Sequence, residues 1–278
     1  MKILIENEYS TLKKVIMARV DGFYLTPPIN KTQKNYYLTN PPSVGKLKQQ
    51  QESFVNLLEE FDVEIFWADP MNNSPYQINT RDVSFVIKDT LFISKMKETI
   101  RMNEPKGLER IVNKIEKHIV MVDGITEGGD VIVDNGRVIV GISQRTNLCG
   151  VKELEERLPS GYTLLPLNLK EGHLHLDTVF NIISKDAAIC CKEALDEQSY
   201  KWLSEQYKLF NVTLEEQNSL ATNTFSLTPN DIVVDPRNIM TNNYLKHEKL
   251  EIFKLDFSEI SKIGGLFRCS TCPLLRRD

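Results

Sequence analysis

Short apolar runs separated by polar turns recur along the chain and predict β-hairpins. The clearest case surrounds Asp134-Asn135-Gly136, which stands between the apolar runs 131–133 and 137–142. Asn-Gly between two apolar runs is the strongest short-range indication of a hairpin. On the same pattern, hairpins are predicted over residues 83–94, 131–142, 178–190 and 225–234.

Apolar residues at helical spacing lie between the hairpins. After Asn103, a plausible N-cap, the positions i, i+3, i+4 and i+7 from Leu108 to Ile115 are apolar and predict a helix. Further helices are predicted from Thr146, from Asp196 with a face that includes Leu203, Tyr207 and Phe210, and over 44–61, which leads into a strand at 63–67.

A short polar motif precedes each hairpin and returns once more near the end of the chain. Its equivalent positions are 48, 47, 46 and 46 residues apart, at Asp82, Asp130, Asp177, Asn223 and Cys269. A fixed period of this size indicates a repeat architecture with one supersecondary unit per repeat. The predicted fold is therefore a five-bladed, pseudo-symmetric α/β-propeller of ββαβ-like units, forming a single domain over residues 1–278.

The fifth unit is incomplete, because the chain ends nine residues after Cys269. The segment 12–19 is a strand candidate without a partner of its own, and it could supply the missing strand and close the ring. Such closure protects the edges of the sheets. The alternative is that the equal spacing is accidental in an ordinary α/β chain.

Composition narrows the class of protein. A hydrophobic content of 41% and a charged content of 26% over 278 residues are typical of a globular protein. The chain has no apolar run of about 18 residues and no evident signal peptide, so we expect a cytoplasmic protein without a membrane partner. The net charge of -4 argues against nucleic acid as the partner. Five cysteines, an odd number, favour free thiols.

The last fifteen residues hold the strongest chemical candidate. Gly264-Gly265 allows a tight turn and a close approach, and Cys269 follows with arginines on both sides. Because nearby positive charge lowers the pKa of a thiol, we expect Cys269 to be a nucleophile. Cys269 and Cys272 also form a CxxC pair. The short remaining chain argues against a redox motif, and the lack of a second CxxC argues against a zinc site.

Convergence of the motifs would place an acid/base group beside the nucleophile. His175 is the candidate, and either Glu127 or Asp130 could orient and charge it. Alone, His175 would be better explained as a hydrogen-bonded core histidine, but its phase in the repeat favours the catalytic role. Asp130 could instead accept backbone N–H groups of the Gly128-Gly129 turn, or join the substrate site.

Two further carboxylates, Asp82 and Asp177, would stand next to an attacking thiolate. Clustered anions are costly unless a cation lies among them, and a planar guanidinium matches paired carboxylates. We therefore expect a guanidinium substrate whose central carbon is attacked by the cysteine. Arg101 and Arg145 could bind an α-carboxylate at its other end, or could be ordinary surface charges. Asn223 is either a turn residue or a ligand contact.

Four motifs taken together resemble the guanidino-group-modifying superfamily, the penteins. They are Thr80-Arg81-Asp82, Glu127-Gly128-Gly129-Asp130, His175-Leu176-Asp177 and Gly264-Gly265-x-x-Arg268-Cys269. The superfamily includes arginine deiminases, dimethylarginine dimethylaminohydrolases, agmatine deiminases and glycine amidinotransferases, and the resemblance covers nearly the whole chain.

The resemblance implies a five-bladed α/β-propeller and a role for each matched residue. No metal or other cofactor is expected, and the oligomeric state is left open, with a homodimer as one option. The implied roles are Cys269 as nucleophile, His175 as general acid/base, Glu127 as its partner, Asp82 and Asp177 on the guanidinium, and Arg101 and Arg145 on the carboxylate. Asp130 and Asn223 are further substrate-site candidates from their place in the repeat.

The function expected first is hydrolysis of the guanidino group of arginine or a close derivative, through a covalent thiouronium on Cys269. His175-Leu176-Asp177 resembles arginine deiminases, whereas dimethylarginine hydrolases usually lack the acid at this position. The tail after Cys269 resembles amidinotransferases, so amidino transfer to an amine is the alternative. The chain also lacks the helical insertion of typical bacterial arginine deiminases. A third option is a non-catalytic propeller that binds a guanidino ligand or a partner.

The sequence of residues 26–42 predicts a long loop, and whether this loop forms a lid is left open.

Overall fold

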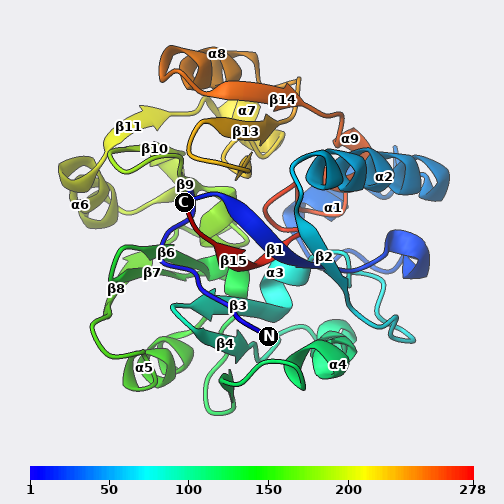
Figure 1. Ribbon diagram of the computed structural model, residues 1–278. Coiled ribbons are helices and arrows are strands. Elements are labelled where there is room, and N and C mark those ends of the chain that lie inside the picture. The colour runs from blue at the N-terminus through cyan, green and yellow to red at the C-terminus, as the bar shows by residue number, and fades with distance from the viewer.

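The computed structural model of residues 1–278 contains five sheets of three strands each. Figure 1 shows the five sheets around a common centre, with most of the helices towards the outside. This confirms the predicted arrangement of five similar α/β units. The sheets are β3 (Ser84–Ile87), β4 (Thr90–Ile93) and β5 (His118–Val120); β6 (Val131–Asp134), β7 (Arg137–Ile142) and β8 (Thr163–Asn168); β9 (Phe180–Ile182), β10 (Ala187–Cys190) and β11 (Lys208–Asn211); β12 (Phe225–Ser226), β13 (Asp231–Val234) and β14 (Glu251–Lys254); and β15 (Cys272–Arg276), β1 (Leu12–Met17) and β2 (Glu64–Trp67).

Every unit has the same connectivity. Its first two strands pair antiparallel, and its third strand returns parallel to the second. A parallel return needs a crossover, and a helix supplies it in each unit. The helices are α1 (Lys31–Tyr36), α2 (Val44–Glu60), α3 (Thr80–Val83), α4 (Glu109–Val112), α5 (Leu148–Glu156), α6 (Glu197–Gln206), α7 (Leu214–Asn218), α8 (Ile239–His247) and α9 (Ser258–Ser261).

The fifth unit is built from both ends of the chain. Strand β15 pairs antiparallel with β1, and β1 pairs parallel with β2; α2 lies in the connection from β1 to β2, on the outer side of the unit (Figure 1). The N-terminal segment therefore supplies the strand that the C-terminal unit lacks, as the sequence predicted. Strand β1 ends at Met17, two residues before the predicted boundary at 19.

Two predicted helices are shorter in the structure. The segment after Asn103 is a 3-10 helix over Glu104–Leu108 followed by the four-residue α4, and Asn103 makes no side-chain cap. The Gly107 carbonyl accepts a hydrogen bond from the Asp69 N–H, which ties this turn to the loop after β2. Helix α6 ends at Gln206, so placing Tyr207 and Phe210 on its face was wrong. Phe210 lies in β11, because the parallel ladder with β10 satisfies its backbone groups.

The segment 26–42 is not entirely a loop. It contains α1, whose N-cap Asn30 accepts a hydrogen bond from the Gln33 N–H. The Gln33 side chain in turn donates to the Ile263 carbonyl at 2.8 Å, close to the Gly264-Gly265 turn. These bonds fix one end of α1 against the segment that carries the candidate nucleophile.

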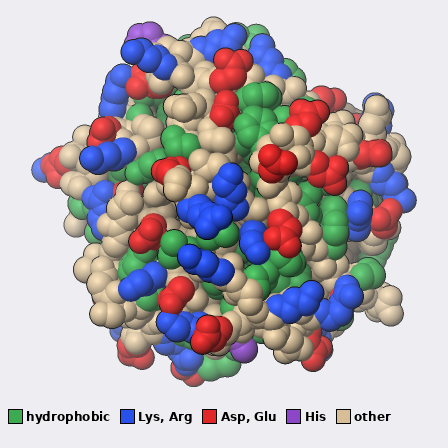
Figure 2. All heavy atoms as spheres, in the orientation of Figure 1, with side chains coloured by type: hydrophobic (Ala, Val, Ile, Leu, Met, Phe, Trp, Pro, Cys, Tyr) green, Lys and Arg blue, Asp and Glu red, His purple; other side chains and the backbone are tan.

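Lysine and arginine side chains are interspersed with aspartate and glutamate on the face shown in Figure 2. Below the surface, buried apolar side chains form three clusters of 25, 23 and 23 residues. No helix of the protein is both long and apolar enough to cross a bilayer.

Phe54 connects α2 with two other parts of the fold, and we expect its truncation to be costly. The side chain is fully buried, and its ring meets those of Phe225, Phe257 and Phe267 edge to face. Phe54→Ala should lower the free energy of unfolding by about 3–5 kcal/mol, measured by urea denaturation. Leu38→Ala, at a side chain that is 92% exposed, is the control and should change it little. Equal stability of the two variants would contradict this account of the core.

Candidate active site

The structure brings the predicted site residues into one buried region. Asp82 lies in α3, Asp130 and Asp177 lie in short 3-10 turns before β6 and β9, and Cys269 lies just before β15. Each motif thus stands at the start of its unit's first strand. All nine predicted residues are at most 3% exposed, namely Asp82, Arg101, Glu127, Asp130, Arg145, His175, Asp177, Asn223 and Cys269.

Asn223 holds the cysteine in place. Its side-chain oxygen accepts hydrogen bonds from the Cys269 N–H at 3.2 Å and the Leu266 N–H at 3.1 Å, and its Nδ2 donates to Cys269 Sγ at 3.2 Å. The turn before the cysteine needs glycine, since a Cβ on Gly265 would lie 2.6 Å from the Cys269 Cβ. Gly264 adopts φ +107°, a conformation that other residues rarely take.

The charge around Cys269 is opposite to the prediction. Its sulfur lies 3.6 and 3.8 Å from the two oxygens of Asp177. Burial, together with the negative charges of Asp177 and Asp82, raises the pKa of the thiol well above its usual value. The predicted lowering by the flanking arginines was wrong as a net effect: Arg268 interacts with Cys269 but donates to Glu8, Arg276 donates to two backbone carbonyls, and their charge does not outweigh burial and the two carboxylates. Without a cation bound beside it, Cys269 is therefore a thiol at neutral pH.

His175 and Glu127 form a buried ion pair. Nε2 of His175 lies 2.9 Å from Oε2 of Glu127. Burial alone would lower the pKa of His175, but the carboxylates of Asp82, Asp130 and Glu127 outweigh it and raise the pKa to about 9. Nδ1 of His175 has no hydrogen-bond partner and stands 3.6 Å from Oδ1 of Asp82, which also has none. The imidazolium thus keeps one N–H free for a further acceptor.

The two arginines are engaged with carboxylates inside the protein. Arg101 Nη1 donates to Asp82 at 2.6 Å, and its other nitrogens donate to Glu104 at 2.8 and 2.9 Å. Arg145 donates to the Ile29 carbonyl at 3.2 Å, and its Nη1 stands 3.6 Å from Glu127. They are not surface charges. Their binding of a substrate carboxylate stays a prediction.

Asp130 joins two of the units. Its Oδ1 accepts from the Leu176 N–H at 2.8 Å, and its Oδ2 accepts from the Ser143 hydroxyl at 2.7 Å. Burial raises the pKa of this carboxyl to about 7. One bond goes to the turn between His175 and Asp177 and the other to Ser143, and neither goes to the Gly128-Gly129 N–H groups considered in the sequence. Asp130 therefore positions that turn.

Two buried acids of this region were missed in the sequence. Glu104 is fully buried and holds Arg101, and burial raises its pKa to about 7. The i, i+3 spacing of Arg101 and Glu104 could have indicated the pair. Glu8 pairs with Arg268, which is 260 residues away, and no local pattern indicates such a contact.

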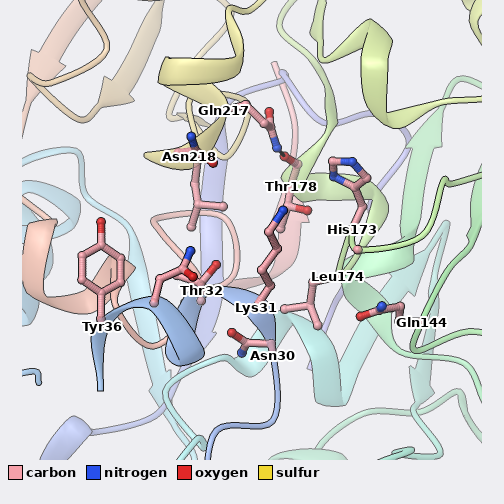
Figure 3. A pocket seen from close by; sticks show the side chains of 14 residues that line it. Asn30, Lys31, Thr32, Tyr36, Gln144, His173, Leu174, Thr178, Gln217 and Asn218 are labelled. Carbon is pink, nitrogen blue, oxygen red and sulfur yellow. Dashed lines mark hydrogen bonds between the residues drawn. The ribbon is translucent and has the colours of Figure 1, made fainter. Parts of the chain in front are cut away.

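A cavity of about 280 Å³ adjoins the site. It is lined by His173, Leu174, Thr178 and Gly264, which are sequence neighbours of His175, Asp177 and Gly265. Figure 3 shows residues of α1 on one side of it and His173 with Leu174 on another. The lining contains no Asp or Glu. Part of the segment 26–42 therefore forms a wall of the space above the buried centre.

Ligand atoms of Asp82, Glu127 and His175 lie within 4.8 Å of one another, which is close enough for a metal site. Arg101 lies 2.6 Å from Asp82, and Arg101 and Arg145 lie 3.9 and 3.6 Å from Glu127. These guanidinium groups already supply the positive charge that a metal ion would bring.

Comparison with known proteins identifies the family. A family model described as "N,N dimethylarginine dimethylhydrolase, eukaryotic" matches residues 23–276. The uncharacterized protein YkgA of Bacillus subtilis is 38% identical over 278 residues, which cover all of this chain and 96% of that protein. The chain therefore belongs to this family and, with it, to the pentein superfamily of guanidino-group-modifying enzymes.

More distant relatives include enzymes with several different reactions on guanidino groups. An arginine deiminase of Limosilactobacillus fermentum is 27% identical over 77% of this chain, which spans 64% of that enzyme's length. Among solved structures, the amidinotransferase SxtG of Microseira wollei aligns with a TM-score of 0.86 at 16% identity, covering 99% of this chain and 98% of that one. The N-terminal domain of ArgZ, a cyanobacterial arginine dihydrolase, aligns with a TM-score of 0.87 at 17% identity, covering 95% and 97%. The two structures support the fold.

Removal of the negative charge of Glu127 should change the protonation of His175. In Glu127→Gln we expect the pKa of His175 to fall from about 9 by about one unit or more, because an opposite charge in contact is lost. The ring would then lose its proton at a lower pH. NMR titration of the histidine ring signals measures this, and the chain has only four histidines. Glu153→Gln, at a carboxylate on α5, is the control. An unchanged titration of His175 in Glu127→Gln would contradict the ion pair.

Proposed function

We propose that the protein hydrolyses the guanidino group of arginine or a close arginine derivative, giving a ureido product and ammonia or an amine. The observation that carries this proposal is the position of Cys269, whose sulfur lies within 4 Å of both oxygens of Asp177 in a fully buried site. We also infer that the five units form a closed five-bladed propeller, which the pairing of β15 with β1 supports.

The charges of the site favour a cationic substrate. Asp177 and Asp82 raise the pKa of the Cys269 thiol, so their charge opposes the nucleophilic form of the cysteine. A guanidinium bound between the two carboxylates would neutralise them and place positive charge next to the sulfur. The same binding event would then lower the pKa of the thiol and produce the thiolate. In this way the substrate itself contributes to activation.

The residues present account for both halves of a hydrolytic reaction. The Cys269 thiolate adds to the central guanidinium carbon, and the carbon–nitrogen bond to the departing group breaks as the His175 imidazolium donates its proton to that nitrogen. A thiouronium on Cys269 and a neutral His175 remain. His175 then takes a proton from a water molecule as the water attacks the thiouronium carbon. The carbon–sulfur bond breaks, the second proton of the water passes to the departing sulfur, and the ureido product leaves with Cys269 again a thiol and His175 again an imidazolium. The proton that the thiol released to solvent on substrate binding is taken up by the departing ammonia or amine.

Asp177 favours an unsubstituted guanidino group. A carboxylate accepts hydrogen bonds and cannot donate them, so it pairs best with nitrogens that carry N–H groups. A dimethylated nitrogen offers none. The deiminase relatives agree with this preference, whereas the family description names dimethylarginine. Amidino transfer is the alternative, because it would share the first half of the reaction and use an amine in place of water. The third option is a propeller that binds a guanidino ligand or a partner without catalysis.

Product analysis decides between these functions. We expect purified protein and L-arginine to give citrulline and ammonia, measured by mass spectrometry, at a rate that added glycine or lysine does not change. Formation of ornithine only in the presence of an added amine, together with a new guanidino compound, would establish amidino transfer instead. Cys269→Ala should abolish the turnover, and retained activity would exclude the nucleophilic role of this residue.

Asp177→Asn should raise KM and lower kcat for the unsubstituted guanidine, because a charge-assisted contact is lost and a neutral amide replaces the anion. A hydrogen bond to a charged group contributes roughly 1.5–3 kcal/mol, so kcat/KM should fall at least about tenfold. Steady-state kinetics at neutral pH measure the effect. Asp235→Asn, which removes a buried carboxylate paired with Arg237, is the control. Unchanged kinetics in Asp177→Asn would remove this residue from the substrate site.

A further inference from the structure

A buried ion pair lies directly behind the nucleophile. Glu8, from the segment before β1, is 3% exposed, and its Oε2 accepts a hydrogen bond from Arg268 Nη1 at 2.6 Å. Its other oxygen accepts from the Val133 N–H of β6 at 3.1 Å. The N-terminal segment thus places the Glu8 carboxylate at the centre of the fold, where it binds Arg268, the residue next to Cys269.

Arg268 connects this pair to the candidate substrate site. Its Nη2 donates to the Val131 carbonyl at 3.3 Å, so two of its three nitrogens are fixed by protein acceptors. The third, Nε, is buried without a hydrogen-bond partner and lies 3.6 Å from Oδ2 of Asp177. Arg268 is therefore anchored on its far side and directed at Asp177 with an N–H that is free.

The surrounding charges leave a positive excess behind Asp177. Arg81, Arg268 and Arg276 are all buried here, and Glu8 lies among them. Burial would raise the pKa of Glu8, but Arg268 and Arg81 outweigh it and lower the pKa to about 2. Glu8 is therefore ionised and offsets part of this positive charge.

We propose that Glu8 and Arg268 are positioning residues for the reaction: Arg268 keeps Asp177 in its ionised form beside Cys269, and Glu8 fixes Arg268 and limits the positive charge that reaches Asp177. Neither residue touches the reacting atoms. The assignment rests on the proposed function only for the role of Asp177 in binding the guanidinium.

The charged groups around Asp177 determine in which direction each substitution should shift its pKa. Burial raises the pKa of Asp177 to about 6, and Arg268 is the largest opposing influence. His175 and Arg81 act in the same direction as Arg268, while Asp82 raises the pKa further. The Cys269 sulfur, which is also in contact, is a neutral thiol in the free protein. Loss of the Arg268 charge should therefore favour protonated Asp177, and loss of the Glu8 charge should favour the carboxylate.

The test is a carbon NMR titration of aspartate side-chain carboxyls in the free protein, with the Asp177 signal assigned by its absence in Asp177→Asn. Arg268→Gln should raise the midpoint of Asp177 by about one pH unit or more, since an opposite charge within about 4–6 Å shifts a pKa by this amount. Glu8→Gln should lower it. Arg268→Lys, which keeps the charge, should stay closer to the parent protein than Arg268→Gln.

The opposite signs of the two shifts distinguish positioning from a merely structural role. If Glu8→Gln and Arg268→Gln move the midpoint in the same direction, or leave it unchanged in folded protein, the proposal is overturned. If Arg268→Gln does not fold, the Glu8→Gln and Arg268→Lys titrations still decide, because the proposal requires a lower midpoint in the first and a midpoint near that of the parent protein in the second. Glu153→Gln is the matched control for a buried carboxylate elsewhere.

A second measurement tests whether the shifts in the Asp177 midpoint change the pH dependence of substrate turnover. If arginine is turned over, the acidic limb of kcat/KM should move to higher pH in Arg268→Gln and to lower pH in Glu8→Gln, with a rise in KM at neutral pH in the former. If no guanidine is turned over by the parent protein, the proposed function fails. The titration of Asp177 remains a separate result, because it needs no substrate.

Discussion

The crowding of carboxylates in a buried centre is the constraint on which the rest of this structure depends. Asp82, Glu127, Asp130 and Asp177 are all at most 2% exposed. Buried carboxylates that lie close together are tolerated only where cations or hydrogen-bond donors accompany them. The protein supplies Arg101 and Arg145 near Glu127, Arg268 near Asp177, and the His175 imidazolium between Asp82 and Glu127.

Positive charge is distributed unequally between Glu127 and Asp177. Glu127 has two arginines and a histidine within 4 Å, which fix it as an anion and keep His175 protonated. Asp177 has only Arg268 at 3.6 Å and the Cys269 thiol. The side nearest Cys269 is therefore the side where an additional cation would be most stabilised. This asymmetry agrees with the proposed activation of the Cys269 thiol by a bound guanidinium.

The closure of the last unit by the first strand has a chemical consequence beyond protection of sheet edges. Pairing of β15 with β1 brings the segment before β1 across the centre, where Leu4 pairs with Leu275 and Asn7 with Asp134. Glu8 lies within that crossing segment and reaches Arg268. The two ends of the chain thus meet next to Cys269, and loss of the N-terminal segment would affect charge as well as packing.

The sequence by itself determined the five repeats, their ββαβ order and the residues that meet at the centre. Apolar alternation and turn residues act locally. Because they recur with a period of 46–48 residues, the same local structure forms five times, with Asp82, Asp130, Asp177, Asn223 and Cys269 at equivalent positions.

Only the tertiary structure decided the end of α6, because the backbone of Phe210 pairs with a strand that is not adjacent to it in sequence. It also decided the charge state of Cys269. The adjacent arginines suggested activation, but adjacency in sequence does not fix where a long side chain points. Arg268 extends to Glu8, and the cysteine faces Asp177, because burial and hydrogen bonding in three dimensions determine which charges meet.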